Sequence, residues 1–140
     1  MTQEQKELVL KDLCGRLPYG VKCQFEDTIE IIKEIWFCED EGWQVDGEKT
    51  STCIHAVKPY LFPLSSMTDE LWDKEFRGYG ITEFTRDSFK YGCETLEFNN
   101  CNPNLLNMVG FINQLIRNHF DIYGLIPMGL ANDATGKNIY

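Results

Sequence analysis

The feature that most constrains the fold of this chain is a broad apolar stripe with helical spacing near its C-terminal end. The stripe comprises Leu105, Met108, Val109, Ile112, Leu115, Ile116 and Phe120. Apolar residues at such intervals lie on one side of an α-helix, and that side must be covered by another element. Asn102 and Pro103 suit the N-cap and the first helical position. The sequence therefore predicts a long helix here, with one wide packing face.

A second amphipathic helix is predicted near the start of the chain, over residues 3–14. Apolar residues recur there at helical spacing, and Gly15 offers a place for the helix to stop. Thr2 and Gln5 have the spacing of a capping box, in which each side chain accepts a hydrogen bond from the other residue's backbone N–H. The start of this helix is therefore predicted from its cap as well as from its periodicity.

Period-two alternation dominates residues 26–38, after Val21, Cys23 and Phe25 on one parity. Apolar residues fall mostly on odd positions and acids mostly on even positions, and the segment holds four isoleucines. β-Branched residues with this period are typical of strands. A helix through Ile29, Ile32 and Trp36 is the alternative, because short apolar runs are ambiguous. The alternation favours the strand.

Turn signals follow this segment. Residues 39–42, with the sequence Glu-Asp-Glu-Gly, are expected to close a hairpin onto residues 43–45, with the sequence Trp-Gln-Val. Asp46 and Gly47 form a strong turn dipeptide. Residues 52–57 then have the composition of a further strand.

The middle of the chain is less regular. Pro59 and Pro63 bracket an extended segment, which is expected at a sheet edge or outside the sheet because proline cannot donate to a strand ladder. Thr68 can cap a short helix that runs through Trp72. Beyond this helix the pattern weakens, and a strand over 93–98 is the main expectation.

These elements indicate a single α+β domain over residues 1–140. The length fits one compact domain. We expect an N-terminal helix, a small and mainly antiparallel sheet, and a long C-terminal helix that covers one face of the sheet. Residues 131–140 are expected to form a loose tail.

The charge balance disfavours several classes of partner. The chain has 13 basic and 22 acidic residues, for a formal net charge of −9. It lacks the excess of cations that displaces counterions from nucleic-acid phosphates or docks on anionic lipids. The opening residues are polar and acidic, and no apolar run is long enough for a signal peptide or a membrane span. We expect a cytoplasmic protein that binds neither nucleic acid nor membrane directly.

Six cysteines and two histidines limit the available chemistry. No export signal accompanies the cysteines, so we expect reduced thiols. No Cys-x-x-Cys pair is present, which disfavours a zinc set of Cys53, His55, Cys93 and Cys101. Cys53 and His55 lie two positions apart in a predicted strand and could share a face. His119 is expected at the end of the last helix, where the helix dipole favours a cation. No metal or cofactor is predicted.

Most of the negative charge falls in one segment. Residues 26–48 contain nine acids and one lysine, which amounts to −8 and leaves −1 for the rest of the chain. On a strand, Glu26, Glu30 and Glu34 would share one face. Acids at a hairpin edge prevent aggregation, and they can also dock a basic partner with a tryptophan as anchor. The candidate binding residues are Glu39, Asp40, Glu41, Trp43, Asp46 and Glu48.

Three segments carry a family resemblance. They are residues 7–21 (ELVLKDLCGRLPYGV), 58–68 (KPYLFPLSSMT) and 118–131 (NHFDIYGLIPMGLA), which together cover 40 of the 140 residues. In this order they resemble a family of short proteins that are encoded by phages and prophages of gut bacteria. The resemblance implies a phage or mobile-element context, and it implies no activity, cofactor or site residue.

We therefore expect a small, non-enzymatic accessory protein of a phage or prophage that binds a basic protein partner through the acidic hairpin. An enzyme or small-ligand binder that uses Cys53 and His55 is the first alternative. A small component of the virion or of its assembly is the second. The acidic hairpin is the feature on which the leading hypothesis depends.

Overall fold

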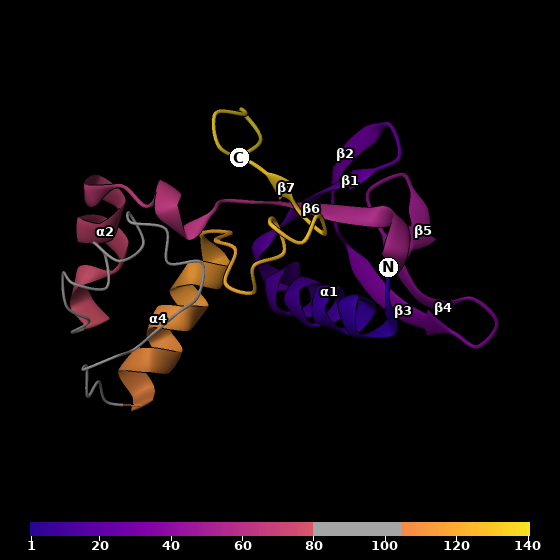
Figure 1. Cartoon of the computed structure of the whole chain (residues 1–140), viewed down its shortest axis with the longest axis horizontal. Helices are drawn as coiled ribbons and strands as arrows, with labels where there is room; N and C mark the ends of the chain where they lie inside the picture. The colour runs from indigo at the N-terminus through magenta and orange to yellow at the C-terminus, as the bar shows by residue number, and fades with distance from the viewer. Residues whose placement is uncertain (80–104) are drawn as a thin grey trace. The chain divides into compact units, whose positions relative to one another are not determined.

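Helices and mainly antiparallel strands build this protein, which confirms the predicted α+β class (Figure 1). The computed structural model describes residues 1–79 and 105–140. Its contacts divide the chain into two compact units. The first comprises Met1–Leu61 with Leu125–Tyr140, and the second comprises Phe62–Gly124.

The first unit begins with helix α1, Gln3–Arg16, close to its predicted bounds. The capping box is present, because Gln5 N–H donates to Thr2 Oγ1 over 3.2 Å and Thr2 N–H donates to Gln5 Oε1 over 2.8 Å. The helix passes through Gly15 instead of stopping there. The chain turns away only at Gly20, whose φ of +68° suits glycine.

A buried ion pair lies in the last turns of α1. Arg16 Nε donates to Asp12 Oδ2 over 2.8 Å, and Arg16 Nη2 donates to Asp12 Oδ1 over 2.7 Å. The two side chains are 0% and 1% exposed. An interior tolerates two charged groups when they are paired in this bidentate way. A 3₁₀ turn at Leu17–Tyr19 follows the pair directly.

A four-stranded sheet follows in the first unit. Its strands are β1 Lys22–Phe25, β2 Thr28–Ile31, β6 Val57–Leu61 and β7 Asn132–Asp133, in the order β2-β1-β6-β7. β1 is antiparallel to β2 and β6, whereas β7 is parallel to β6. Alternate residues of β1 enter the core, where Cys23 and Phe25 are buried.

A three-stranded antiparallel sheet completes the first unit. Its strands are β3 Glu34–Cys38, β4 Gly42–Asp46 and β5 Ser51–Cys53, with β4 in the centre. The strand prediction for residues 26–38 is confirmed over the helix, but the strand is divided. Glu26, at φ +43°, turns β2 back onto β1. Ile32 is buried between β2 and β3, where the chain passes from one sheet to the other.

The strand predicted over residues 52–57 is wrong in its middle. A 3₁₀ turn at Ile54–Ala56 separates β5 from β6. Ile54 is buried, whereas its neighbours in the turn are exposed. Burial of this one side chain therefore interrupts the alternation that suggested a continuous strand.

Pro59 lies in an inner strand, contrary to the expectation of an edge or an excluded segment. β6 is flanked by β1 and β7, and Pro59 stands opposite Cys23 (Figure 1). β7 pairs only with Tyr60 and Leu61. Because Pro59 precedes both residues, the parallel ladder does not need its missing N–H. Because β7 is so short, a proline is tolerated in an inner strand of this sheet.

Residues 131–140 dock on the first unit rather than forming the loose tail that we expected. β7 belongs to this segment, and buried Ala134 donates its N–H to Leu61 O over 2.8 Å. The Tyr140 hydroxyl donates to Tyr60 O over 2.7 Å. These partners are distant in sequence, so local composition could not indicate them.

The second unit contains helices α2 and α4. Their bounds are Asp69–Glu75 and Leu105–Arg117, and 3₁₀ turns lie at Leu64–Ser66 and Arg77–Tyr79. Thr68 caps α2 as predicted, because its Oγ1 accepts from Leu71 N–H over 3.2 Å. The strand expected over 93–98 and the helix start expected at Asn102 and Pro103 lie outside the described residues.

The apolar face of α4 packs on α2. Phe111 and Leu115 are fully buried in a cluster with Trp72 and Phe76. The ring centroid of Phe111 lies 5.9 Å from that of Trp72 and 5.4 Å from that of Phe76, both in edge-on geometry. Within the second unit, α2 therefore covers the apolar stripe of α4.

His119 lies at the C-terminal end of α4, as predicted. It adopts φ +60° and donates its N–H to Ile116 O over 3.0 Å, while Phe120 N–H donates to Leu115 O over 2.9 Å. These two bonds form a Schellman motif, which satisfies the last carbonyl groups of the helix. Phe120 is thereby turned into the aromatic cluster of the unit.

Candidate functional site

The predicted hairpin is present, and its turn carries three acids. β3 and β4 pair in antiparallel register, with Cys38 opposite Gly42. Glu39, Asp40 and Glu41 link the strands and are exposed. Gly42 takes φ +80°, a conformation that glycine adopts without strain. Three carboxylates therefore sit at one end of the hairpin, which we call the acidic tip (Glu39–Glu41).

The six candidate binding residues divide between the two ends of the hairpin. Trp43 lies beside the acidic tip, whereas Asp46 ends β4, roughly 10 Å from Trp43 at the rise of an extended strand. Asp46 Oδ2 accepts a hydrogen bond from Trp36 Nε1 over 3.1 Å. Glu48 pairs with Lys33 over 3.3 Å between Oε1 and Nζ. The structure thus gathers four of the six residues and separates Asp46 and Glu48 from them.

Phe37 and Trp43 form an exposed aromatic pair beside the acidic tip. They stand opposite each other in the register, and their ring centroids lie 5.3 Å apart with an interplanar angle of 66°. Phe37 is 58% exposed and Trp43 is 40% exposed. Aromatic residues supply much of the binding energy at protein interfaces. Trp43 is among the candidate residues predicted from the sequence, whereas Phe37 is not, although the register of the hairpin places it opposite Trp43.

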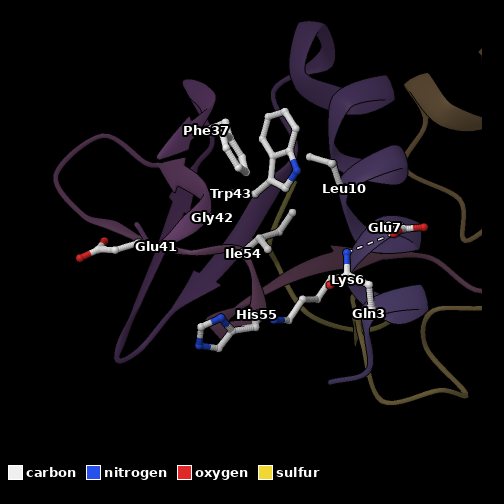
Figure 2. Close-up of a pocket in the computed structure, with 10 residues that line it drawn as sticks. All are labelled: Gln3, Lys6, Glu7, Leu10, Phe37, Glu41, Gly42, Trp43, Ile54 and His55. Carbon is white, nitrogen blue, oxygen red and sulfur yellow. Dashed lines mark hydrogen bonds between the residues drawn. The ribbon is translucent and has the colours of Figure 1, made fainter. Parts of the chain in front are cut away.

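A cleft of about 190 Å³ lies between α1 and the hairpin (Figure 2). Apolar side chains from α1, the hairpin and the 3₁₀ turn meet there, namely Leu10, Phe37, Trp43 and Ile54. Lys6 and His55 add basic groups, and Glu41 joins the cleft to the acidic tip. A dry cavity of about 150 Å³ accommodates one benzene ring, so the cleft is the size of a single large side chain.

Cys53 and His55 do not share a strand face. β5 ends at Cys53, and His55 lies in the 3₁₀ turn that follows. Cys53 Sγ accepts a weak hydrogen bond from Gln44 Nε2 over 3.4 Å. His55 is exposed and lines the cleft. The alternation that suggested a thiol and an imidazole on one face is therefore interrupted.

Glu30 does not belong to the exposed acidic surface, although the sequence placed it on one face with Glu26 and Glu34. It is only 7% exposed. Its carboxylate accepts hydrogen bonds from the Thr50 hydroxyl over 2.6 Å and from Lys49 N–H over 2.7 Å. These bonds, the Thr50 bond foremost, lower the pKa of Glu30 from 4.5 to about 2. Glu30 thus anchors the turn between β4 and β5.

Replacing Glu30 with glutamine is expected to remove part of the pH dependence of stability. Because the folded-state pKa lies below the ordinary value, the carboxylate stabilises the fold fully above about pH 4.5 and loses this effect as the pH falls towards about 2. The difference in free energy of unfolding between wild type and Glu30→Gln should therefore shrink across this range. Urea unfolding at a series of pH values measures it.

The exposed Glu34→Gln variant serves as the control for this measurement. Its carboxylate lies at the surface, so the difference from wild type should stay small at every pH. A Glu30→Gln difference that is constant from neutral pH down to about pH 2 would show that the hydrogen bonds at Glu30 do not lower its pKa.

Metal ligands do not cluster within residues 1–79 and 105–140. No three His, Cys, Asp or Glu side chains in these ranges are placed to hold an ion. Cys93 and Cys101 of the disfavoured zinc set lie outside them. In the same part of the chain, no helix is both long and apolar enough to cross a bilayer.

Comparisons with protein-family models, with curated proteins and with solved structures found no match. The candidate site consists of the acidic tip, the aromatic pair of Phe37 and Trp43, and the cleft beside them.

Proposed function

We propose that this protein is a non-enzymatic binding protein, which docks a basic protein partner through the acidic tip and the Phe37–Trp43 pair. The observation that carries the proposal is the position of three exposed carboxylates directly beside two exposed aromatic rings. A charged surface and an apolar anchor are thus neighbours at one end of a single hairpin.

The carboxylates and the rings have different roles in this proposal. Exposed charges attract an oppositely charged partner and raise the rate of association. Aromatic rings that lose their water on contact supply most of the affinity. The adjoining cleft adds apolar area from Leu10 and Ile54. In this proposal the charges of the acidic tip raise the association rate, and the two aromatic rings slow dissociation.

The other two acids of the candidate set have smaller roles. Asp46 is engaged by the indole N–H of Trp36, and Glu48 is paired with Lys33. Their charges are already partly compensated within the protein. The proposed contact surface therefore consists of the acidic tip with Phe37 and Trp43.

We further propose that the protein acts in the cytoplasm as an accessory protein of a phage or prophage. The support is the resemblance of the segments at 7–21, 58–68 and 118–131 to proteins of that context. Acidic surfaces associate readily with proteins that carry a basic groove for nucleic acid. Such a protein is the class of partner that fits the tip.

A peptide-display selection against the full chain tests the charge of the partner. We expect enriched peptides to carry a net positive charge together with apolar residues. The combined variant Glu39→Gln, Asp40→Asn and Glu41→Gln is expected to slow the association of an enriched peptide by about tenfold at low ionic strength, because steering depends on these charges. Biolayer interferometry measures the association rate.

The matched control removes three exposed charges elsewhere, through Glu4→Gln, Glu26→Gln and Asp27→Asn. It has the same net charge as the tip variant, and its association rate should stay near that of wild type. Equal slowing in both variants would attribute the effect to net charge and reject the tip as the site. Enrichment of acidic or uncharged peptides would also contradict the proposal.

A further inference from the structure

We propose that the basic partner contributes an extended segment that adds to the outer edge of β3 as a fourth strand. This inference rests on the proposed function and specifies how the partner binds. β3 is the outermost strand of the three-stranded sheet, and in the part of the chain that the structure describes no strand pairs with its free side. Unpaired N–H and C=O groups at such an edge are a template for a further strand.

The edge of β3 lacks proline, lysine and a bulge, three features that commonly protect an exposed strand. Proline, an inward charge or a bulge commonly prevents pairing with other chains. β3 has neither proline nor lysine between Glu34 and Cys38. It instead exposes Trp36 by 40% and Phe37 by 58%. A regular edge with two exposed aromatic rings suits the addition of a strand.

The two faces of β3 specify what the added strand must carry. Phe37 lies on the face of the cleft, opposite Trp43. Glu34 and Trp36 lie on the other face, because side chains alternate along a strand. An added strand therefore meets the Phe37 ring on one face, and the Glu34 carboxylate with the Trp36 ring on the other. Alternating apolar and basic residues satisfy both faces, and one apolar side chain can enter the cleft.

Charge argues against a second copy of this chain as the occupant of the edge. Residues 33–41 carry one lysine and four acids, for a net charge of −3. Pairing of two such edges would bring two negative segments together, and like charges at a close interface weaken association. A basic segment from another protein has the complementary charge, and it also reaches the acidic tip at the end of β3.

A synthetic peptide tests this mode of binding on the full chain. The probe alternates lysine with valine, leucine and valine over seven residues and carries a fluorescent label. The comparison peptide has the same composition, with its lysines and its apolar residues in two separate blocks. We expect the alternating peptide to bind at least about tenfold more tightly, because only it places lysines on one face of a strand. Fluorescence anisotropy measures both affinities.

Methylation of successive backbone nitrogens of the probe provides the decisive second measurement. In an added strand, only alternate N–H groups face the neighbouring strand. We expect N-methylation to weaken binding by about tenfold at every second position and to have little effect at the positions between. Equal affinity of the two peptides, no detectable binding of either, or effects without this period would overturn the proposal.

The outcomes separate this inference from the proposed function. A tip variant that slows the selected peptides, together with N-methyl effects that lack the period, leaves the docking site in place and rejects strand addition. Sedimentation of the protein without peptide tests whether a second copy of this chain occupies the edge of β3. A dimer that the probe peptide dissociates would assign the edge of β3 to a second copy and overturn the proposal.

Discussion

Replacing Asp12 with alanine is expected to lower the free energy of unfolding by about 3–5 kcal/mol. Arg16 is fully buried and donates two hydrogen bonds to the Asp12 carboxylate, over 2.8 Å and 2.7 Å. Removal of the carboxylate takes away both of these hydrogen bonds and the negative charge that Asp12 places against the buried guanidinium. A buried charge that loses its partner is among the most destabilising changes in a protein interior.

Urea unfolding of the Asp12→Ala variant measures this effect. The exposed pair of Asp73 and Arg77 is a matched control, because it has the same i, i+4 spacing and its side chains are 58% and 75% exposed. Arg77→Ala is expected to cost no more than about 0.5 kcal/mol. Equal effects of the two variants would contradict the burial of the Asp12–Arg16 pair.

A double replacement separates the net value of the pair from the cost of breaking it. The combined variant Asp12→Leu and Arg16→Met removes both charges and keeps most of the volume. We expect it to be far more stable than Asp12→Ala, because it removes the buried guanidinium together with the carboxylate. A double variant as unstable as Asp12→Ala would indicate that the shape of the two side chains matters more than their charges.

Replacing Phe111 with alanine is expected to destabilise the second unit by about 3–5 kcal/mol. Phe111 is fully buried and lies in edge-on contact with Trp72, Phe76 and Tyr79. The substitution removes the ring on which α2 and α4 pack and leaves a cavity among aromatic side chains. The cost combines lost burial with the cavity that remains.

Fluorescence of Trp72 can follow this unit separately. The chain has two other tryptophans, both in the first unit, and Trp36→Phe with Trp43→Phe leaves Trp72 as the single reporter. Leu106→Ala on the same helix is the control, because Leu106 is 76% exposed and its truncation should change stability by no more than about 0.5 kcal/mol. A Phe111→Ala midpoint equal to that of the control would contradict the described packing.

Local signals in the sequence predicted the elements that depend on local interactions. The cap of α1 at Thr2, the cap of α2 at Thr68 and the acidic hairpin turn are all confirmed. Each involves residues within a few positions of one another, so periodicity and turn chemistry were sufficient. The end of α4 at His119 is a feature of the same kind.

Features that depend on distant partners could not be predicted in this way. Pro59 is inside a sheet only because β7 arrives from the far end of the chain and stops short of it. The sequence predicts that Glu30 shares a face with Glu26 and Glu34. Its hydrogen-bond donors lie at residues 49–50, too far along the chain for a local pattern to indicate. The burial of Arg16 likewise depends on how α1 packs, which no local pattern indicates.

The residues of the candidate site divide in the same way, into those that local sequence signals predicted and those that depend on distant partners. Trp43 and the acidic tip were predicted, because they lie within one short hairpin. The cleft was not, since it requires Leu10 from α1 and Ile54 from the 3₁₀ turn beside the hairpin. Phe37 is the intermediate case, because its partner Trp43 is close in sequence but only the register reveals the pairing.

The docked C-terminal segment determines the order in which the two units can be completed during synthesis. β6 emerges from the ribosome long before β7, and the whole of Phe62–Gly124 is translated between them. The four-stranded sheet therefore waits for its last strand while the second unit already has all of its residues. Units fold separately and ordinarily from the N-terminus onward. The first unit is therefore the first to be translated in part and the last to have all of its residues.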